Sequence, residues 1–214
     1  MIGYYNYTVV LTFMSLISAL VGITLSIDGV HLGAIACLAL SGFFDMLDGP
    51  VARTKSDRSH DERLFGIQLD SLCDLVAFGV FPVVICFNLG VKGPIGFVVL
   101  ISFAVCGVIR LGYFNVRETN NFFSEEVHEK IFIGLPITSI AVVLPLVYIL
   151  STFMTDQAFV LVLHFVLLIV GTLFIGNFQV HKPKLRTLII FCVLVAIAIT
   201  AVAIIDFPHL IFEL

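Results

Sequence analysis

The chain has 214 residues, of which 60% are hydrophobic and 12% are charged, and its formal net charge is −4. A soluble domain carries about twice that share of charged residues, and the mean hydropathy of +1.14 is that of a chain dissolved largely in lipid. The composition therefore excludes an ordinary soluble domain, and with so few basic residues we expect no nucleic-acid partner.

Apolar segments long enough to cross a bilayer recur along the chain. About 20 apolar residues span the hydrocarbon core as a helix, and a helix satisfies its own backbone there. The predicted spans are residues 8–27, 31–52, 65–90, 94–114, 132–153, 157–178 and 187–206. We predict an all-α integral membrane protein with one membrane domain over residues 1–214. Pro136 and Pro145 lie inside the fifth span and are expected to bend it.

The basic residues gather on one side of the predicted membrane. Ten of the eleven lysines and arginines lie in or beside the breaks at 53–63, 115–130 and 179–186, and only Lys92 lies on the other side. The positive-inside rule therefore predicts a multi-pass protein of the cell membrane whose N-terminus and active site face the cytoplasm. A capping box of Ser59 and Glu62 is expected to start the third helix ahead of the membrane.

Four aspartates lie toward the cytoplasmic ends of the second and third predicted spans. Asp45 and Asp48 are three residues apart, and Asp70 and Asp74 are four apart, so each pair shares one helix face. The short connection makes these spans antiparallel neighbours, so the pairs can meet at a similar depth. Ionised acids there cost roughly 2.5–3.5 kcal/mol each at the helix centre. We therefore expect one or two divalent cations, Mg²⁺, Mn²⁺ or Ca²⁺.

Small residues and one arginine flank the acids. Gly49, Ala52 and Gly66 would allow tight helix–helix packing. They would equally leave room for a flat ligand whose phosphates reach the cations, with Arg53 as a charged donor to a bound diphosphate. The residues alone leave both explanations open.

The row Asp45-x-x-Asp48-Gly49-x-x-Ala52-Arg53, then Gly66-x-x-x-Asp70-x-x-x-Asp74, resembles the signature of the CDP-alcohol phosphotransferases. These membrane enzymes transfer a phosphatidyl or related group from a CDP-linked donor to an alcohol. The resemblance implies that the four aspartates bind Mg²⁺ or Mn²⁺ and that Asp74 is the general base. It also implies a six-helix catalytic core over residues 8–178, with 187–206 as an additional transmembrane helix. The residues implied to contact the CDP donor are Asp48, Gly49, Ala52, Arg53, Gly66 and Asp70.

The sequence departs from the family pattern in one place. Twelve residues, Thr54 to Phe65, separate the signature arginine from the second glycine, where the family usually has eight. The additional residues fall in a polar loop, where insertions are well tolerated.

Three further stretches resemble the phosphatidylserine synthase branch of the family: 68–82 (QLDSLCDLVAFGVFP), 106–116 (CGVIRLGYFNV) and 132–137 (FIGLPI). This resemblance implies transfer from CDP-diacylglycerol to L-serine, giving phosphatidylserine and CMP, by an enzyme that forms homodimers. Arg110 is a candidate for binding the acceptor carboxylate or a phosphate, and its alternative is a snorkelling anchor. Ser71 and Asn115 are further candidates for the acceptor site.

Two alternative functions stay open. Within the family, the acceptor could be glycerol 3-phosphate or inositol phosphate, which would need an additional basic cluster beside the acids. The candidates for such a cluster are Arg58, Arg63, Arg110 and Arg117. Outside the family, the acids could serve a divalent-cation transporter. Transport sites, however, lie near the midplane in repeated folds, whereas these acids gather at one end.

Overall fold

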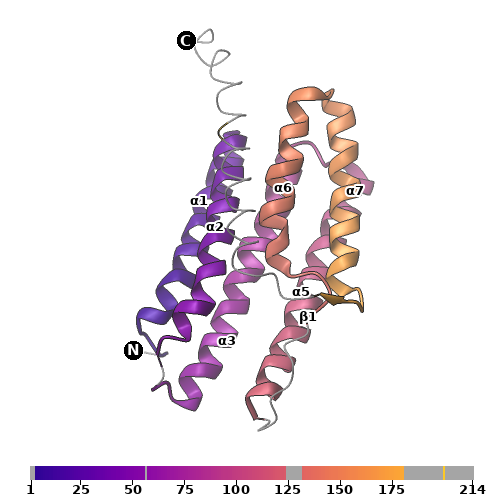
Figure 1. The fold of residues 1–214 in the computed structure, drawn as a ribbon. Helices are drawn as coiled ribbons and strands as arrows, with labels where there is room; N and C mark the ends of the chain where they lie inside the picture. The colour runs from indigo at the N-terminus through magenta and orange to yellow at the C-terminus, as the bar shows by residue number, and fades with distance from the viewer. Residues whose placement is uncertain (1–2, 56, 124–131, 181–199, 201–214) are drawn as a thin grey trace.

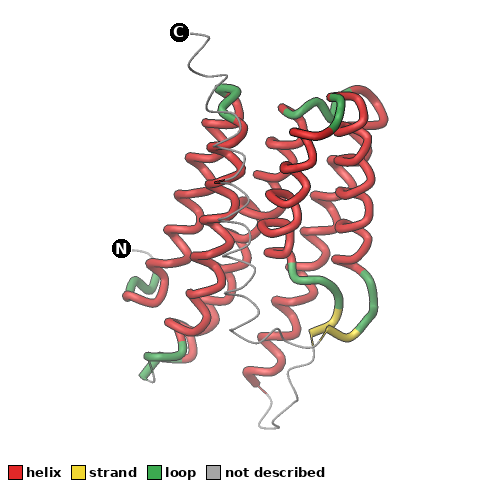
Figure 2. The backbone as a smooth tube through the Cα atoms, turned by 45° about the horizontal axis from the view of Figure 1, so that its top comes forward, coloured by secondary structure: helices red, strands yellow, loops and turns green. Residues whose placement is uncertain are grey.

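The computed structural model describes residues 3–55, 57–123, 132–180 and 200. Over these ranges the chain is almost entirely helical (Figures 1 and 2). The α-helices are α1 (Val10–Ile27), α2 (His31–Ala52), α3 (His60–Asp74), α4 (Phe81–Asn88), α5 (Gly93–Phe123), α6 (Ile140–Tyr148) and α7 (Asp156–Ile175). The short elements are the 3-10 turns η1 (Tyr7–Val9), η3 (Ile137–Ser139) and η4 (Ile149–Phe153), the π-helical segment η2 (Leu75–Val80), and the strands β1 (Phe132–Ile133) and β2 (Gln179–Val180).

Five of the described stretches are long and apolar enough to cross a membrane. They are Tyr7–Ile27, His31–Ala52, His60–Asn88, Gly93–Asn120 and Asp156–Ile175. These match five of the predicted spans, so a helical membrane fold is confirmed. The apolar stretch Ile137–Phe153 is shorter, and the predicted seventh span, 187–206, lies outside the described residues.

The prediction for the fifth span, 132–153, was wrong at its start. Residues 132–133 form a strand paired antiparallel with 179–180, and the helical turns begin only after Pro136. Gly134 has a φ of +73°, and a Cβ there would lie 2.9 Å from the Phe174 carbonyl oxygen, so this turn requires glycine. Pro136 therefore precedes the helix instead of bending it, whereas Pro145 lies within α6.

The fourth predicted span ended too early. Helix α5 continues to Phe123, past the predicted end at residue 114, and its far end extends beyond the β1–β2 pair in Figure 1. Residues 115–120 are mostly polar, so a span predicted from hydropathy ends before them. A helix that leaves the bilayer can nevertheless continue with polar residues facing water.

Glycines allow the closest helix contacts in the bundle. A Cβ at Gly22 of α1 would lie 2.1 Å from the ring of Phe81, and one at Gly42 of α2 would lie 2.6 Å from Cβ of Ala141 on α6. Helices α1 and α2 lie side by side in both views (Figures 1 and 2), and α2 also packs against α6. Close backbone approach through small residues is how helices associate in lipid, where apolar burial gives little driving force.

The start of α3 is fixed by polar contacts at one end of the bundle. The predicted capping box is confirmed: the Ser59 hydroxyl accepts from the Glu62 amide (3.2 Å), and the Glu62 carboxylate accepts from the Ser59 amide (3.0 Å). The Tyr4 hydroxyl donates to Asp61 (3.4 Å), whose negative charge raises the pKa of Tyr4. The N-terminal segment therefore lies at the same end of the bundle as the α2–α3 loop.

Candidate functional site

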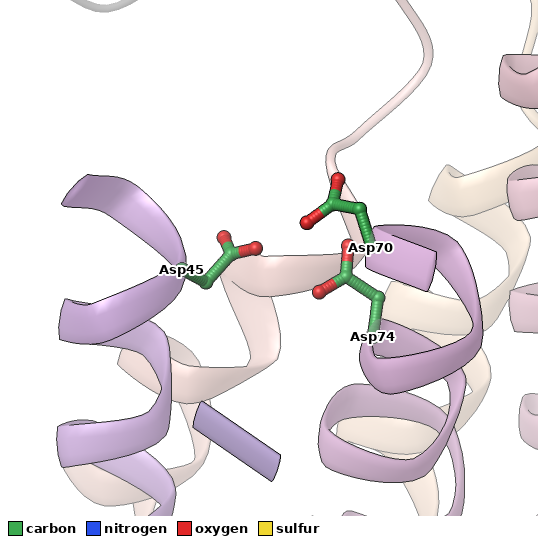
Figure 3. Close-up of side chains that lie close together, drawn as sticks. All are labelled: Asp45, Asp70 and Asp74. Carbon is green, nitrogen blue, oxygen red and sulfur yellow. The ribbon is translucent and has the colours of Figure 1, made fainter. Parts of the chain in front are cut away.

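Three of the four predicted carboxylates converge between α2 and α3. One oxygen each from Asp45, Asp70 and Asp74 lies within 4.8 Å of the others. Figure 3 shows Asp45 on one helix facing Asp70 and Asp74 on the other. The last two share a face because they are one turn apart on α3. The α2–α3 connection thus brings acids far apart in the sequence into one cluster, called the carboxylate cluster below.

Asp48 lies at the edge of this cluster. Its side chain is buried, and its Oδ2 accepts a hydrogen bond from the Thr12 hydroxyl of α1 (3.2 Å). The sequence analysis did not single out Thr12. A signal was present, however, because buried polar residues recur at helical spacing along the first span: Thr8, Thr12, Ser15 and Ser18. Ser15 bonds Ser41 of α2 at 2.8 Å, so this stripe faces α2.

One carboxylate oxygen in the cluster would be stabilised by a positively charged partner. Within the described part of the chain, Oδ1 of Asp70 is buried and has no hydrogen-bond partner. A buried carboxylate oxygen left unsatisfied is costly, and here it faces further carboxylates instead of donors. A divalent cation would satisfy that oxygen and offset the repulsion, and oxygen-only ligands suit Mg²⁺, Mn²⁺ or Ca²⁺. The residues present therefore fit such an ion.

The two signature glycines each lie beneath an arginine. A Cβ built at Gly49 would lie 3.5 Å from Nη2 of Arg53, and one at Gly66 would lie 2.6 Å from Nη2 of Arg58. Their closest neighbours are thus flexible side chains, unlike the helix contacts made at Gly22 and Gly42. The Nε of Arg53 donates to the Gly49 carbonyl of its own helix (3.1 Å). Space over both glycines can therefore be opened by moving an arginine.

Arg110 of α5 is buried inside the protein. It is only 7% exposed, its Nε donates to the Leu135 carbonyl (3.0 Å), and its guanidinium lies 5.9 Å from the centre of the Phe114 ring. A snorkelling anchor would place its charged head in water, so this burial contradicts that alternative.

The other two acceptor candidates bond each other. The Ser71 hydroxyl of α3 donates to the Asn115 side-chain oxygen of α5, and the Asn115 amide donates to Gln68 (3.4 Å). They join α3 to α5.

These features define a class: a helical membrane protein whose second and third spans bring carboxylates together at one end, next to arginines. Comparison with known families agrees with that class and narrows it. The chain matches the family described as CDP-alcohol phosphatidyltransferase over residues 5–174. It belongs to this family.

Curated relatives cover parts of the chain. A CDP-diacylglycerol–serine O-phosphatidyltransferase of Mycobacterium tuberculosis is 33% identical over 127 residues, 59% of this chain and 43% of the relative. The Saccharomyces cerevisiae protein of the same name is 42% identical over 107 residues, 49% of this chain and 37% of the relative. An archaetidylserine synthase of Methanothermobacter thermautotrophicus is 35% identical over 162 residues, 74% of this chain and 65% of the relative. The matches to the first two span less than half of those proteins.

Proposed function

We propose that this chain transfers the phosphatidyl group of CDP-diacylglycerol to L-serine, giving phosphatidylserine and CMP. The observation that carries the proposal is the convergence of Asp45, Asp70 and Asp74, all from the signature of its family. The names of the bacterial, yeast and archaeal relatives share serine as the acceptor. Serine is therefore favoured over glycerol 3-phosphate or inositol phosphate.

The four aspartates would hold one or two divalent cations, with Mg²⁺ or Mn²⁺ preferred and Ca²⁺ acceptable to the same oxygens. The unpartnered Asp70 oxygen supports this assignment. When bound, such an ion supplies Lewis-acid stabilisation of phosphoryl oxygens that gain charge during transfer.

The protein's own residues would bind the substrates and accept the proton. The serine hydroxyl oxygen forms a bond to the phosphorus that bears the diacylglycerol, the bond from this phosphorus to the bridging oxygen breaks, and CMP leaves with that oxygen. Asp74, buried in the carboxylate cluster, takes the hydroxyl proton. Arg53 pairs with the donor diphosphate above Gly49. Arg110, anchored through Nε, offers the rest of its guanidinium to the serine carboxylate.

The proposal includes a location and an assembly. The basic-residue bias supports a cytoplasmic N-terminus and a cytoplasmic site in the cell membrane, and the family resemblance supports a homodimer. A divalent-cation transporter is less well supported, because Arg53 and Arg58 lie over the glycines one helical turn from the acids and would repel a cation in transit.

The test is CMP release by the purified full chain supplied with CDP-diacylglycerol. L-serine, glycerol 3-phosphate and inositol phosphate are compared, each with Mg²⁺, with Mn²⁺ and with excess EDTA. We expect release only with serine and a divalent cation, lost in Asp74→Asn and retained in Asp61→Asn, which removes an exposed acid from the same helix. Release with another acceptor would overturn the choice of serine. No cation-dependent release from folded protein would overturn the enzyme assignment.

A further inference from the structure

The loop before α3 places a second arginine, Arg58, over the signature glycine that lies one turn ahead of Asp70. Arg58 lies between the two helices that carry the acids: its Nη1 donates to the Ala52 carbonyl at the end of α2, and its Nη2 donates to the Glu62 carbonyl in the first turn of α3. Both bonds are 3.4 Å long, which is beyond the usual range for such a donor. Among the residues that the structure describes, the buried Nε has no hydrogen-bond partner. The guanidinium is thus fixed in place yet poorly satisfied.

Arg58 and Arg53 occupy matching positions on the two sides of the cluster. Gly49 lies one turn beyond Asp45 on α2, and Arg53 lies over it; Gly66 lies one turn ahead of Asp70 on α3, and Arg58 lies over it. Each of the two positive side chains therefore lies over the helix turn that adjoins a cluster aspartate, and those aspartates suit divalent cations. A ligand that bridges both kinds of charge must be strongly anionic and able to reach two arginines and the cations together. A nucleoside diphosphate has this chemistry.

The local structure holds Arg58 in this position. Lys55 pairs with Glu62 at 3.3 Å, and the Ser59–Glu62 capping box fixes the chain directly after Arg58. A Cβ at Gly66 would lie 2.6 Å from Nη2 of Arg58, so any larger residue would displace the guanidinium. Arg58 lies in the segment that is longer here than the family usually has, and outside the signature.

We propose that Arg58 binds the diphosphate of the CDP-linked donor, as the partner of Arg53 across the cluster. This inference rests on the proposed function and adds a binding residue to it. On donor binding, the two long bonds and the unpartnered Nε are exchanged for charge-assisted hydrogen bonds to phosphate oxygens, which are shorter and stronger. Because one arginine comes from each helix end, the donor also joins α2 to α3.

The test measures equilibrium binding of CDP, CMP and cytidine to the purified full chain with Mg²⁺. Arg58→Ala is compared with Arg58→Lys and with Lys92→Ala, which removes one positive charge from the opposite side of the predicted membrane. Loss of a charged hydrogen-bonding partner predicts that Arg58→Ala weakens CDP binding about 10- to 100-fold, CMP binding less, and cytidine binding by less than about two-fold. Arg58→Lys should recover part of the lost CDP affinity, because lysine keeps the positive charge but lacks the planar guanidinium that can donate two parallel hydrogen bonds. Lys92→Ala should bind all three ligands like the unaltered protein.

Other outcomes would overturn the proposal. An equal loss of affinity for all three ligands would show that Arg58 only stabilises the loop. Tighter CDP binding in Arg58→Ala would show that Arg58 fills space that the donor needs. If Arg58→Ala fails to fold, Arg58→Gln decides the question with the same three ligands. Unchanged CDP binding in a folded variant would refute the inference while CMP release by the unaltered chain upheld the proposed function. Absence of CDP binding by the unaltered chain, together with absence of CMP release, would refute both.

Discussion

Replacing Asp70 by asparagine should stabilise the cation-free protein and remove most of its response to Mg²⁺. Asp70 has carboxylate oxygens of two other aspartates within 4.8 Å. Two unit charges at that separation repel by about 3.5 kcal/mol at an effective dielectric constant of 20. An asparagine side chain would remove this repulsion and donate hydrogen bonds to the remaining acids. A net gain of about 2–4 kcal/mol follows, which corresponds to about 5–10 °C in melting temperature for a chain of this size.

The assay is thermal unfolding of the detergent-purified chain in excess EDTA and in saturating Mg²⁺. The unaltered protein should melt higher with Mg²⁺, because a ligand that binds only the folded state stabilises it. Asp70→Asn should melt higher than the unaltered protein in EDTA, gain little from Mg²⁺ and release no CMP. The matched control, Asp61→Asn, alters an exposed acid and should change neither melting temperature by more than a degree or two. A lower melting temperature for Asp70→Asn in EDTA, together with a full Mg²⁺ shift, would refute the electrostatic argument.

Two other substitutions test the surroundings of the cluster. Thr12→Val removes the hydroxyl that bonds Asp48, so it should lower the free energy of unfolding by about 1–2 kcal/mol and weaken Mg²⁺ binding in a titration. Thr12→Ser should restore both the stability and the Mg²⁺ affinity. Unchanged Mg²⁺ affinity in Thr12→Val would show that the Thr12–Asp48 bond does not support cation binding. Arg110→Lys replaces a planar fork by a point charge and should raise the KM for serine at least about ten-fold with the KM for CDP-diacylglycerol unchanged. CMP release measured against serine concentration checks this, and an equal rise in both constants would exclude a specific role at the acceptor.

The carboxylate cluster was predictable because its geometry is local. Spacings of three and four residues fix which acids share a helix face, and a short polar loop forces the two helices to be antiparallel neighbours. The capping box at Ser59 and Glu62 was predictable for the same reason, since its partners lie within one turn. These inferences needed only helix periodicity and the short loop, although the resulting cluster joins Asp45 to residues far from it in the sequence.

The start of the fifth span depended on contacts that hydropathy does not record. Residues 132–137 are as apolar as a span, yet the amide of Gly134 donates to the Phe178 carbonyl (2.8 Å) and that of Leu135 donates to the Leu173 carbonyl (3.0 Å). The end of α7 therefore holds this segment extended. The same segment supplies the Leu135 carbonyl that holds Arg110, so the burial of Arg110 could not be foreseen from its position in the sequence either.

Helix α3 connects the two halves of the proposed site. Asp70 faces Asp45 of α2, and the next residue, Ser71, bonds Asn115 of α5. Successive residues of an α-helix are turned by about 100°, so neighbouring positions on α3 contact different helices. Ser71 and Asn115 already bond each other, which leaves them less able to bind serine than Arg110, whose guanidinium hydrogen-bonds through Nε alone among the described residues. Their better-supported role is to position α3 against α5.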